Sequence, residues 1–232
     1  MPITLAALAV DSPDPRRVAR FWAELLGREV VTRAEGVELP GSVTQPTLRF
    51  IPGDAAAGPD RMHLHLTSET PEHQQAQVWR ALDLGGRHLD VGQLPEEGHI
   101  VLADPDGNAF CVIEAGNRYL AGCGPLGEFA CDGRRVTGEF WSVVLGWPLV
   151  WDDGEETAIQ HPDGGTKIAW GGPPLGPKPP RNRHRLVLAS DDPVRDFERL
   201  SALGARLLDA GAGLGALLAD PDENEFHLVA AD

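Results

Sequence analysis

The chain is poor in aromatic residues and cysteines, and it has no long apolar run. Aromatic residues make up 6% of its 232 residues, and only one of them is a tyrosine. The three cysteines, Cys111, Cys123 and Cys131, form no CxxC pair, which favours a reducing cytoplasm over a disulfide scaffold. Because no apolar run approaches ~18 residues, we expect no membrane-spanning helix. Met1–Val10 lacks the basic start and the long apolar stretch of a secretory signal.

Positive charge is also scarce. Twenty Lys and Arg residues stand against 35 Asp and Glu, so the formal net charge is −15. Nucleic acids and anionic membranes are bound through basic patches, so this composition argues against both as partners. The hydrophobic content of 42% is high enough for packed cores. We therefore expect a globular, cytoplasmic protein whose partner is a small molecule.

The sequence contains an internal duplication. FWAELLGREVV at Phe21–Val31 returns as FWSVVLGWPLV at Phe140–Val150, an offset of 119 residues. DPDGNAFCVIEA at Asp104–Ala115 returns as DPDENEFHLVAA at Asp220–Ala231, an offset of 116. A period this long indicates a duplicated domain, since solenoid repeats recur at ~20–50 residues. We predict two domains, residues 1–117 and 122–232, joined by a linker around 117–124.

Each half contains the same order of elements twice, a strand, a helix and three short strands. In the first half the amphipathic helix follows Asp14-Pro15, a good cap followed by a residue suited to the first helical position. In the second half the helices are predicted at Arg135–Leu145 and Arg195–Leu203. Residues Pro52–Asp60 are predicted to be a loop. The proline-rich segment Gly171–Pro180 is predicted to be an extended strap, because proline has no backbone donor.

The motifs resemble one family of proteins. Three motifs carry the resemblance: DSPDP followed by FWAELLG within Asp11–Gly27, the strand RMHLHL that contains His63, and DPDGNAFCV at Asp104–Val112. They are similar to motifs of the vicinal oxygen chelate (VOC) superfamily, which includes glyoxalase-like, bleomycin-resistance-like and extradiol-dioxygenase-like proteins. The resemblance covers nearly the whole chain. It implies an α+β fold in which four βαβββ modules pair into two tandem domains with open, cup-shaped mixed sheets. One fold hosts many reactions, so the resemblance does not fix the chemistry.

The same resemblance implies where a metal would bind. Metal-using members carry a histidine about seven residues before the helix-capping aspartate, which corresponds here to Ala7. A second ligand comes from the strand that opens the next module, where this chain has His63. A third follows the turn asparagine by three residues, which corresponds to Cys111. Alanine cannot bind a metal, so the usual triad is incomplete.

The second half departs further from the pattern. Counting back seven residues from Asp132, the equivalent of Asp14, gives Pro125. Alignment of the strand leucines gives Arg185, and the repeat offset of 116 gives His227. Arginine stays protonated and does not ligate metals. Arg185 is instead a candidate to bind an anionic substrate group, because its planar fork matches carboxylate and phosphate. His63 and His227 are the candidate acid–base residues, since the pKa of histidine lies near neutrality.

Further candidates line the predicted cups. His65 shares a strand face with His63, so the two could bind a metal together with Cys111. The tryptophans present only in the second half could form an aromatic wall for a planar ligand. The substrate-binding candidates are thus Arg185, His65, Cys111, Trp147, Trp151 and Trp170.

Three functions remain open at this point. The first is an enzyme, of lyase or isomerase type, that works without the usual metal triad. The second is a binding protein that sequesters an antibiotic or other small molecule. The third is a metal-dependent dioxygenase or glyoxalase using Fe, Mn, Ni or Zn. We expect no cofactor in the first two. The family often builds its cups across two subunits, and a fused tandem can do so within one chain, which favours a monomer.

Overall fold

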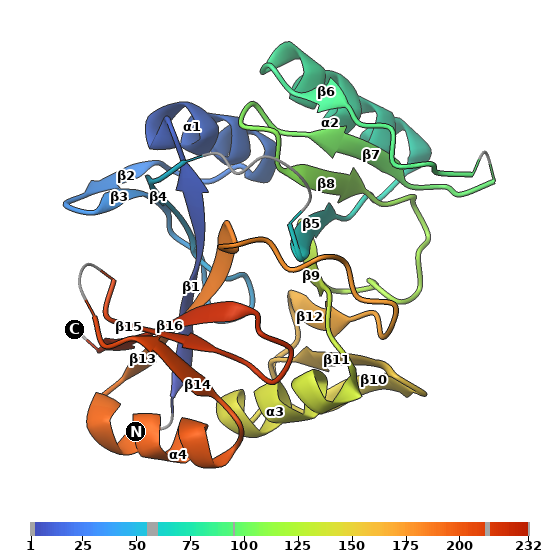
Figure 1. The fold of residues 1–232 in the computed structure, drawn as a ribbon. Helices are drawn as coiled ribbons and strands as arrows, with labels where there is room; N and C mark the ends of the chain where they lie inside the picture. Colours follow the sequence, from blue (N-terminus) through green and yellow to red (C-terminus); the bar gives the residue numbers. More distant parts are fainter. Residues whose placement is uncertain (1–2, 55–59, 95, 212–213, 232) are drawn as a thin grey trace.

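The described residues of the chain form two eight-stranded mixed sheets and four helices, as seen in a computed structural model (Figure 1). The structure describes residues 3–54, 60–94, 96–211 and 214–231. The helices are α1 (Pro15–Leu26), α2 (Pro71–Asp83), α3 (Arg135–Leu145) and α4 (Pro193–Ala202).

The first sheet, sheet A, has strands from both ends of the chain. In spatial order they are β14 (Arg206–Asp209), β15 (Ala216–Ala219), β16 (Glu225–Ala230), β13 (His184–Ser190), β1 (Thr4–Ser12), β4 (Leu48–Pro52), β3 (Gly36–Leu39) and β2 (Val31–Arg33).

The second sheet, sheet B, comes from the middle of the chain. In spatial order it contains β10 (Leu149–Asp153), β11 (Glu156–Gln160), β12 (Lys167–Trp170), β9 (Leu126–Cys131), β5 (Met62–Leu66), β8 (Ala109–Val112), β7 (Ile100–Ala103) and β6 (Arg87–His88).

The four predicted βαβββ modules are all present, and each sheet takes one module from each half of the sequence. β1 pairs antiparallel with β13, and β5 pairs antiparallel with β9. In Figure 1 the blue β1 accordingly lies beside the orange β13. The first and fourth modules thus form sheet A, and the second and third form sheet B. The chain completes both of its sheets by itself.

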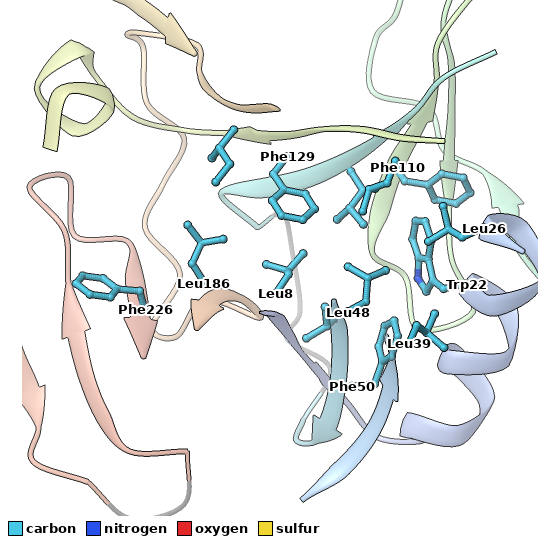
Figure 2. Packing of buried hydrophobic residues seen from close by; sticks show 14 of the residues in the cluster. Leu8, Trp22, Leu26, Leu39, Leu48, Phe50, Phe110, Phe129, Leu186 and Phe226 are labelled. Atoms are coloured by element: carbon cyan, nitrogen blue, oxygen red, sulfur yellow. The ribbon is translucent and has the colours of Figure 1, made fainter. Parts of the chain in front are cut away.

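Alternation along the strands separates a shared core from two outer faces. Side chains of a strand point alternately to opposite faces of its sheet. One set from each sheet, together with the helices, forms a single apolar cluster, in which Figure 2 shows Leu8, Leu48, Phe129 and Leu186. The opposite set forms two smaller clusters, one on each sheet. Each sheet therefore has one face on the common core and another face that is free to form a cup.

The repeated FW and DPD motifs meet inside the core. The indole Nε1 of Trp22 on α1 donates to Asp104 Oδ2 at 3.1 Å, and Trp141 on α3 donates to Asp220 Oδ2 at the same distance. Trp22 also packs edge-on against Phe110 of β8, with ring centroids 5.0 Å apart (Figure 2). These contacts join the first module to the second and the third module to the fourth. The two modules of one sequence half are thus held together although they belong to different sheets.

Backbone amides donate further hydrogen bonds to these two buried carboxylates. Asp104 Oδ1 accepts from the amides of Asp106 and Asn108, and Asp220 Oδ1 accepts from those of Asp222 and Asn224. Burial still raises the pKa of Asp220 to about 6. The motif is therefore a structural turn that presents a carboxylate to an indole.

Two helix boundaries agree with the sequence-based expectation, and one differs. Helix α1 is capped by the Asp14 side chain and ends at Gly27, whose φ of 65° is the left-handed conformation that glycine favours. Helix α3 has the predicted bounds. Helix α4 begins at Pro193, two residues before the predicted start, because Asp192 caps it by accepting from the Arg195 amide at 3.2 Å.

The linker and the strap both pack against the body of the protein. In the linker, Leu120 and Cys123 are buried with Val101 and Cys111 on the outer face of sheet B. The Gly171–Pro180 strap contains no helix or strand, as predicted, and the Gly176 amide donates to Asp132 Oδ2 at 2.9 Å.

Two other expectations concern a loop and membrane insertion. Residues 55–59 of the loop predicted at Pro52–Asp60 lie outside the described residues. Within the described part of the chain, no helix has both the length and the apolar character needed to cross a bilayer.

Replacing Trp22 with Phe should lower the free energy of unfolding by about 1–3 kcal/mol. The change removes the indole donor and leaves a buried carboxylate oxygen of Asp104 with fewer partners. Urea unfolding monitored by circular dichroism measures the loss. Trp79→Phe is the matched control, because Trp79 is 62% exposed on α2 and should change stability by less than about 0.5 kcal/mol. Equal losses in both variants would contradict a structural role for the indole–carboxylate bond.

Candidate functional site

Four ionisable side chains converge on the outer face of sheet B. His63 and His65 come from β5, Cys111 from the adjacent parallel strand β8, and Glu128 from the adjacent antiparallel strand β9. The register places His65 directly beside both Cys111 and Glu128. The alternation HLHL predicts this arrangement, since Leu64 and Leu66 face the core while both imidazoles face outward.

The two histidines and the glutamate form a continuous chain of hydrogen bonds. Nε2 of His65 lies 2.9 Å from Nε2 of His63, and Nδ1 of His65 lies 2.7 Å from Glu128 Oε2. The other oxygen of Glu128 accepts from the Tyr119 hydroxyl at 2.6 Å. Glu128 therefore fixes His65, which in turn contacts His63.

This arrangement separates the pKa values of the two histidines. Burial and the neighbouring positive charge of His65 lower the pKa of His63 to about 4. For His65, burial acts to lower the pKa, but hydrogen bonds to Cys111 and Glu128 outweigh it and raise the pKa to about 9. Near neutral pH, His65 is thus a cation bound to the Glu128 carboxylate, and His63 is neutral.

A groove opens next to His63. It encloses about 500 Å³ and is lined by His63, Tyr119, Glu128, Ala130, Cys131, Asp132, Trp151, Glu156, Thr157, Ala169, Trp170 and Gly171. A larger hollow of about 780 Å³ lies along Arg33, Glu38 and Arg49 of sheet A, but neither histidine nor cysteine lines it. A further hollow of about 670 Å³ is lined by Glu69, His73 and Glu114, but none of the four converging residues lines it. The sheet B groove is therefore distinguished by having His63 and Glu128 of this cluster in its lining.

Glu128 was missed by counting along the sequence. The count placed the ligand-equivalent position of the second half at Pro125, before β9 begins. In the structure Ala7 pairs with Val187, and the matching pair in the other sheet is Glu128 with His65. The count started from Asp132 as the equivalent of the capping residue Asp14, whereas the N-cap of helix α3 is Arg134, so the count started two residues too early. The available signal was a single charged residue inside the apolar strand LGEFAC.

The donor set fits a divalent metal. The ligand atoms of His63, His65 and Cys111 all lie within 4.8 Å of one another. Histidine and cysteine are the side chains that zinc prefers, and three protein ligands leave a position open for a substrate. Metal-bound histidines usually hold a carboxylate through their other nitrogen, as His65 holds Glu128.

In sheet A the candidate residue Arg185 forms a buried ion pair, and the candidate His227 lies beside it. Arg185 is completely buried, and its guanidinium forms two bonds to Asp11, at 2.8 and 2.5 Å. Nε of Arg185 donates to Nε2 of His227 at 3.1 Å. Burial and the charge of Arg185 lower the pKa of His227 to about 4. Arg185 thus holds Asp11 and is not presented to a ligand, and His227 lies beneath the surface beside it.

The rest of the sheet A cup combines an apolar cluster with the ion pair of Glu38 and Arg49. Ala7, Ala9 and Val187 are fully buried and pack with Ile51 and Leu214.

The three tryptophans of the second half have different surroundings. Trp151 is 43% exposed at the groove, and its ring meets that of Tyr119 edge-on at 5.7 Å. Trp170 touches the groove but is 2% exposed, and its ring packs where Gly133 and Gly138 leave room beside α3. Trp147 does not line the groove and packs against His161 at 5.5 Å. Trp151 alone of the three presents a broad aromatic surface to the groove.

The chain belongs to the glyoxalase-like domain family. The model of that family matches residues 7–113 and again residues 128–229, which together are most of the chain. This match confirms the resemblance to the VOC superfamily and the tandem arrangement of glyoxalase-like domains. No curated protein sequence matches the chain.

Solved structures support the same fold. Glyoxalase I from Zea mays superposes with a TM-score of 0.68 at 14% identity, covering 98% of this chain and 92% of the maize chain. A candidate dioxygenase from Bacillus subtilis subsp. subtilis strain 168 gives a TM-score of 0.61 at 14% identity, covering 98% and 84%. At this level of identity the similarity shows the fold and does not define the reaction.

The stability of the protein should fall between about pH 6.5 and pH 9 because of His65. Its pKa is about 9 when folded and has an ordinary value of 6.5, so the folded state holds the proton more tightly. The resulting stabilisation, about 3 kcal/mol, is complete below about pH 6.5 and is lost as the pH rises through 9. Urea unfolding at half-unit pH intervals measures it. Glu128→Gln should flatten this decline, whereas the exposed-residue control His88→Gln should retain it. An identical decline in Glu128→Gln would contradict the assignment.

Arg185→Met should destabilise the protein by about 3–5 kcal/mol, because it leaves the Asp11 carboxylate buried without its main partner. The double variant Asp11→Leu/Arg185→Met should recover most of the loss, as measured by urea unfolding. A single variant of unchanged stability that fails to bind small anions would show instead that Arg185 serves a ligand.

Proposed function

We propose that this protein binds a small organic molecule in the sheet B groove and moves protons on it, as a lyase or isomerase does, with His63 as the acid–base residue. The observation that carries the proposal is the hydrogen-bonded series from Glu128 through His65 to His63, which ends at a groove of about 500 Å³. The fold supports small-molecule binding or catalysis in general, and this series supports the narrower function.

The protonation states define how His63 would act. With His65 protonated, its Nε2–H donates to Nε2 of His63, which leaves the proton of neutral His63 on Nδ1. Nδ1–H of His63 then donates its proton to a ligand atom, while Nε2 of His63 takes the proton of His65. The Glu128 carboxylate keeps its bond to Nδ1–H of His65, now neutral.

The same steps run backwards to remove a proton. Once His63 carries its proton on Nε2, the bare Nδ1 accepts a proton from another ligand atom, and the Nε2 proton returns to His65. One proton is given and one is taken, so the protein ends in its starting state. This balance suits an isomerisation, in which a proton changes position and no electrons leave the ligand.

A second candidate function rests on the ligand atoms within 4.8 Å of one another. His63, His65 and Cys111 would hold a divalent metal, with Glu128 orienting His65. A bound zinc ion would supply Lewis acidity at the groove. Because a metal would occupy the nitrogens that the proton relay needs, metal content distinguishes the two functions.

Other features support a monomer that works in the cytoplasm. Both sheets are complete within one chain, which supports a monomer. The three cysteines are free thiols, as expected of a protein in the reducing cytoplasm.

The experiment compares the wild type with His63→Gln and with the exposed-histidine control His88→Gln. Each tag-free protein, purified without chelator, is analysed by elemental mass spectrometry and then incubated with a metabolite library followed by liquid chromatography–mass spectrometry. We expect little bound metal, conversion by the wild type and the control, and a loss of about 100-fold or more in His63→Gln. Conversion should be sustained between about pH 4 and pH 9, the limits set by the pKa values of His63 and His65.

Three outcomes would contradict the relay. Full conversion by His63→Gln would remove His63 from the chemistry. Stoichiometric metal that is lost in both His63→Gln and Cys111→Ser would establish the metal-dependent alternative. Tight binding of library members that are all recovered unchanged would indicate sequestration.

A further inference from the structure

We infer that the ligand of the sheet B groove is an organic cation, an amine, amidine or guanidine carried on a flat apolar group. The inference rests on the proposed function only in using the same groove. It follows from the charge and the shape of the lining.

Every charged side chain in the lining is a carboxylate. Glu128, Asp132 and Glu156 border the groove, and neither lysine nor arginine does so among the residues described. The carboxylate of Glu156 makes no hydrogen bond or ion pair within the described part of the chain, and Asp132 has one bond, from the Gly176 amide. Glu128 is paired with His65, but an anion entering here would face the carboxylates of Asp132 and Glu156, whereas a cation would gain these two carboxylates as partners.

One lysine lies close to the groove without lining it. Lys167 lies beside Glu128 on β12, but it is 8% exposed, and its ammonium donates to the Tyr119 carbonyl. The ammonium also lies over the Tyr119 ring, 3.9 Å from the centroid. Lys167 is therefore engaged by Tyr119 of the linker and is not part of the groove lining. Arg185 is buried in the other sheet against Asp11, so it cannot supply the missing positive charge.

The shape of the groove favours a flat group. Trp151 and Tyr119 provide aromatic surface on one side. The floor is made of side chains too small to fill the space, Ala130, Ala169 and Gly171. An exposed indole attracts a cation placed over its face and also stacks on flat apolar rings. The net charge of −15 further raises the rate at which cations meet the protein.

Three matched probes separate charge from shape. Benzamidine, benzamide and benzoate have the same ring and carry a positive, a neutral and a negative group, respectively. Binding is measured by isothermal titration calorimetry at low and high salt and located by amide chemical shifts in NMR. We expect benzamidine to bind at least tenfold more tightly than benzamide, with benzoate weakest, and to shift amides of the groove. High salt should reduce the preference for benzamidine.

Substitutions in the groove test whether its side chains cause the preference for a cationic probe. Glu156→Gln should weaken benzamidine by about threefold to tenfold and leave benzamide unchanged, since an exposed carboxylate contributes modestly. Asp163→Asn makes the same change of charge at an exposed site outside the groove and should alter binding by less than about twofold. Trp151→Leu should weaken benzamidine and benzamide alike, because it removes the stacking surface.

The outcomes distinguish this inference from the proposed function. Equal or tighter binding of benzoate, binding of none of the probes, or an effect of Asp163→Asn equal to that of Glu156→Gln would overturn the cationic ligand. None of these results would change whether His63 is needed for conversion, which the His63→Gln comparison decides separately.

Discussion

The bond from a buried indole to a buried carboxylate is the contact on which the arrangement of this protein depends. Trp22 reaches Asp104, and Trp141 reaches Asp220, each at 3.1 Å. Each bond crosses between sheets and joins two modules that are consecutive in sequence. With the modules of one half tied together through their helices, their first strands remain available to pair with the other half. The sharing of both sheets between the halves follows from this division of contacts.

Sharing the sheets brings together residues that are far apart in sequence, and the two cups diverge. In sheet A the buried pair of Asp11 and Arg185 occupies part of the outer face, and an apolar cluster occupies another part. In sheet B the histidines of one half meet Glu128 of the other, and a groove stays open beside them. Duplication supplied two copies of one scaffold. The sheet B copy has His63 and Glu128 at its groove, whereas the hollow along sheet A is lined by Arg33, Glu38 and Arg49.

The sequence motifs were sufficient to predict the fold, because each motif can be recognised within a few residues and specifies a structure at the same place. The FW helices, the capping Asp14 and the DPD turns are each recognised within a few residues, and their repetition gives the modules. The candidate site was predicted in part, since the alternation of His63 and His65 is also local. Glu128 and the partner of Arg185 were not predicted. Both come from pairing between strands of different halves, and counting along the chain does not show which residues such pairing brings together.

Comparison of the two sheets at one register position shows what the fold itself requires. Ala7 and Val187 pair in sheet A at the position where Glu128 and His65 pair in sheet B. The apolar pair is fully buried and adequate for folding. Burying ionisable groups carries a desolvation cost that pairing only partly offsets, and an apolar pair of similar size is often at least as stable. The ionised pair in sheet B is therefore not needed to form the sheet, and its position beside His63 and the groove favours a chemical role.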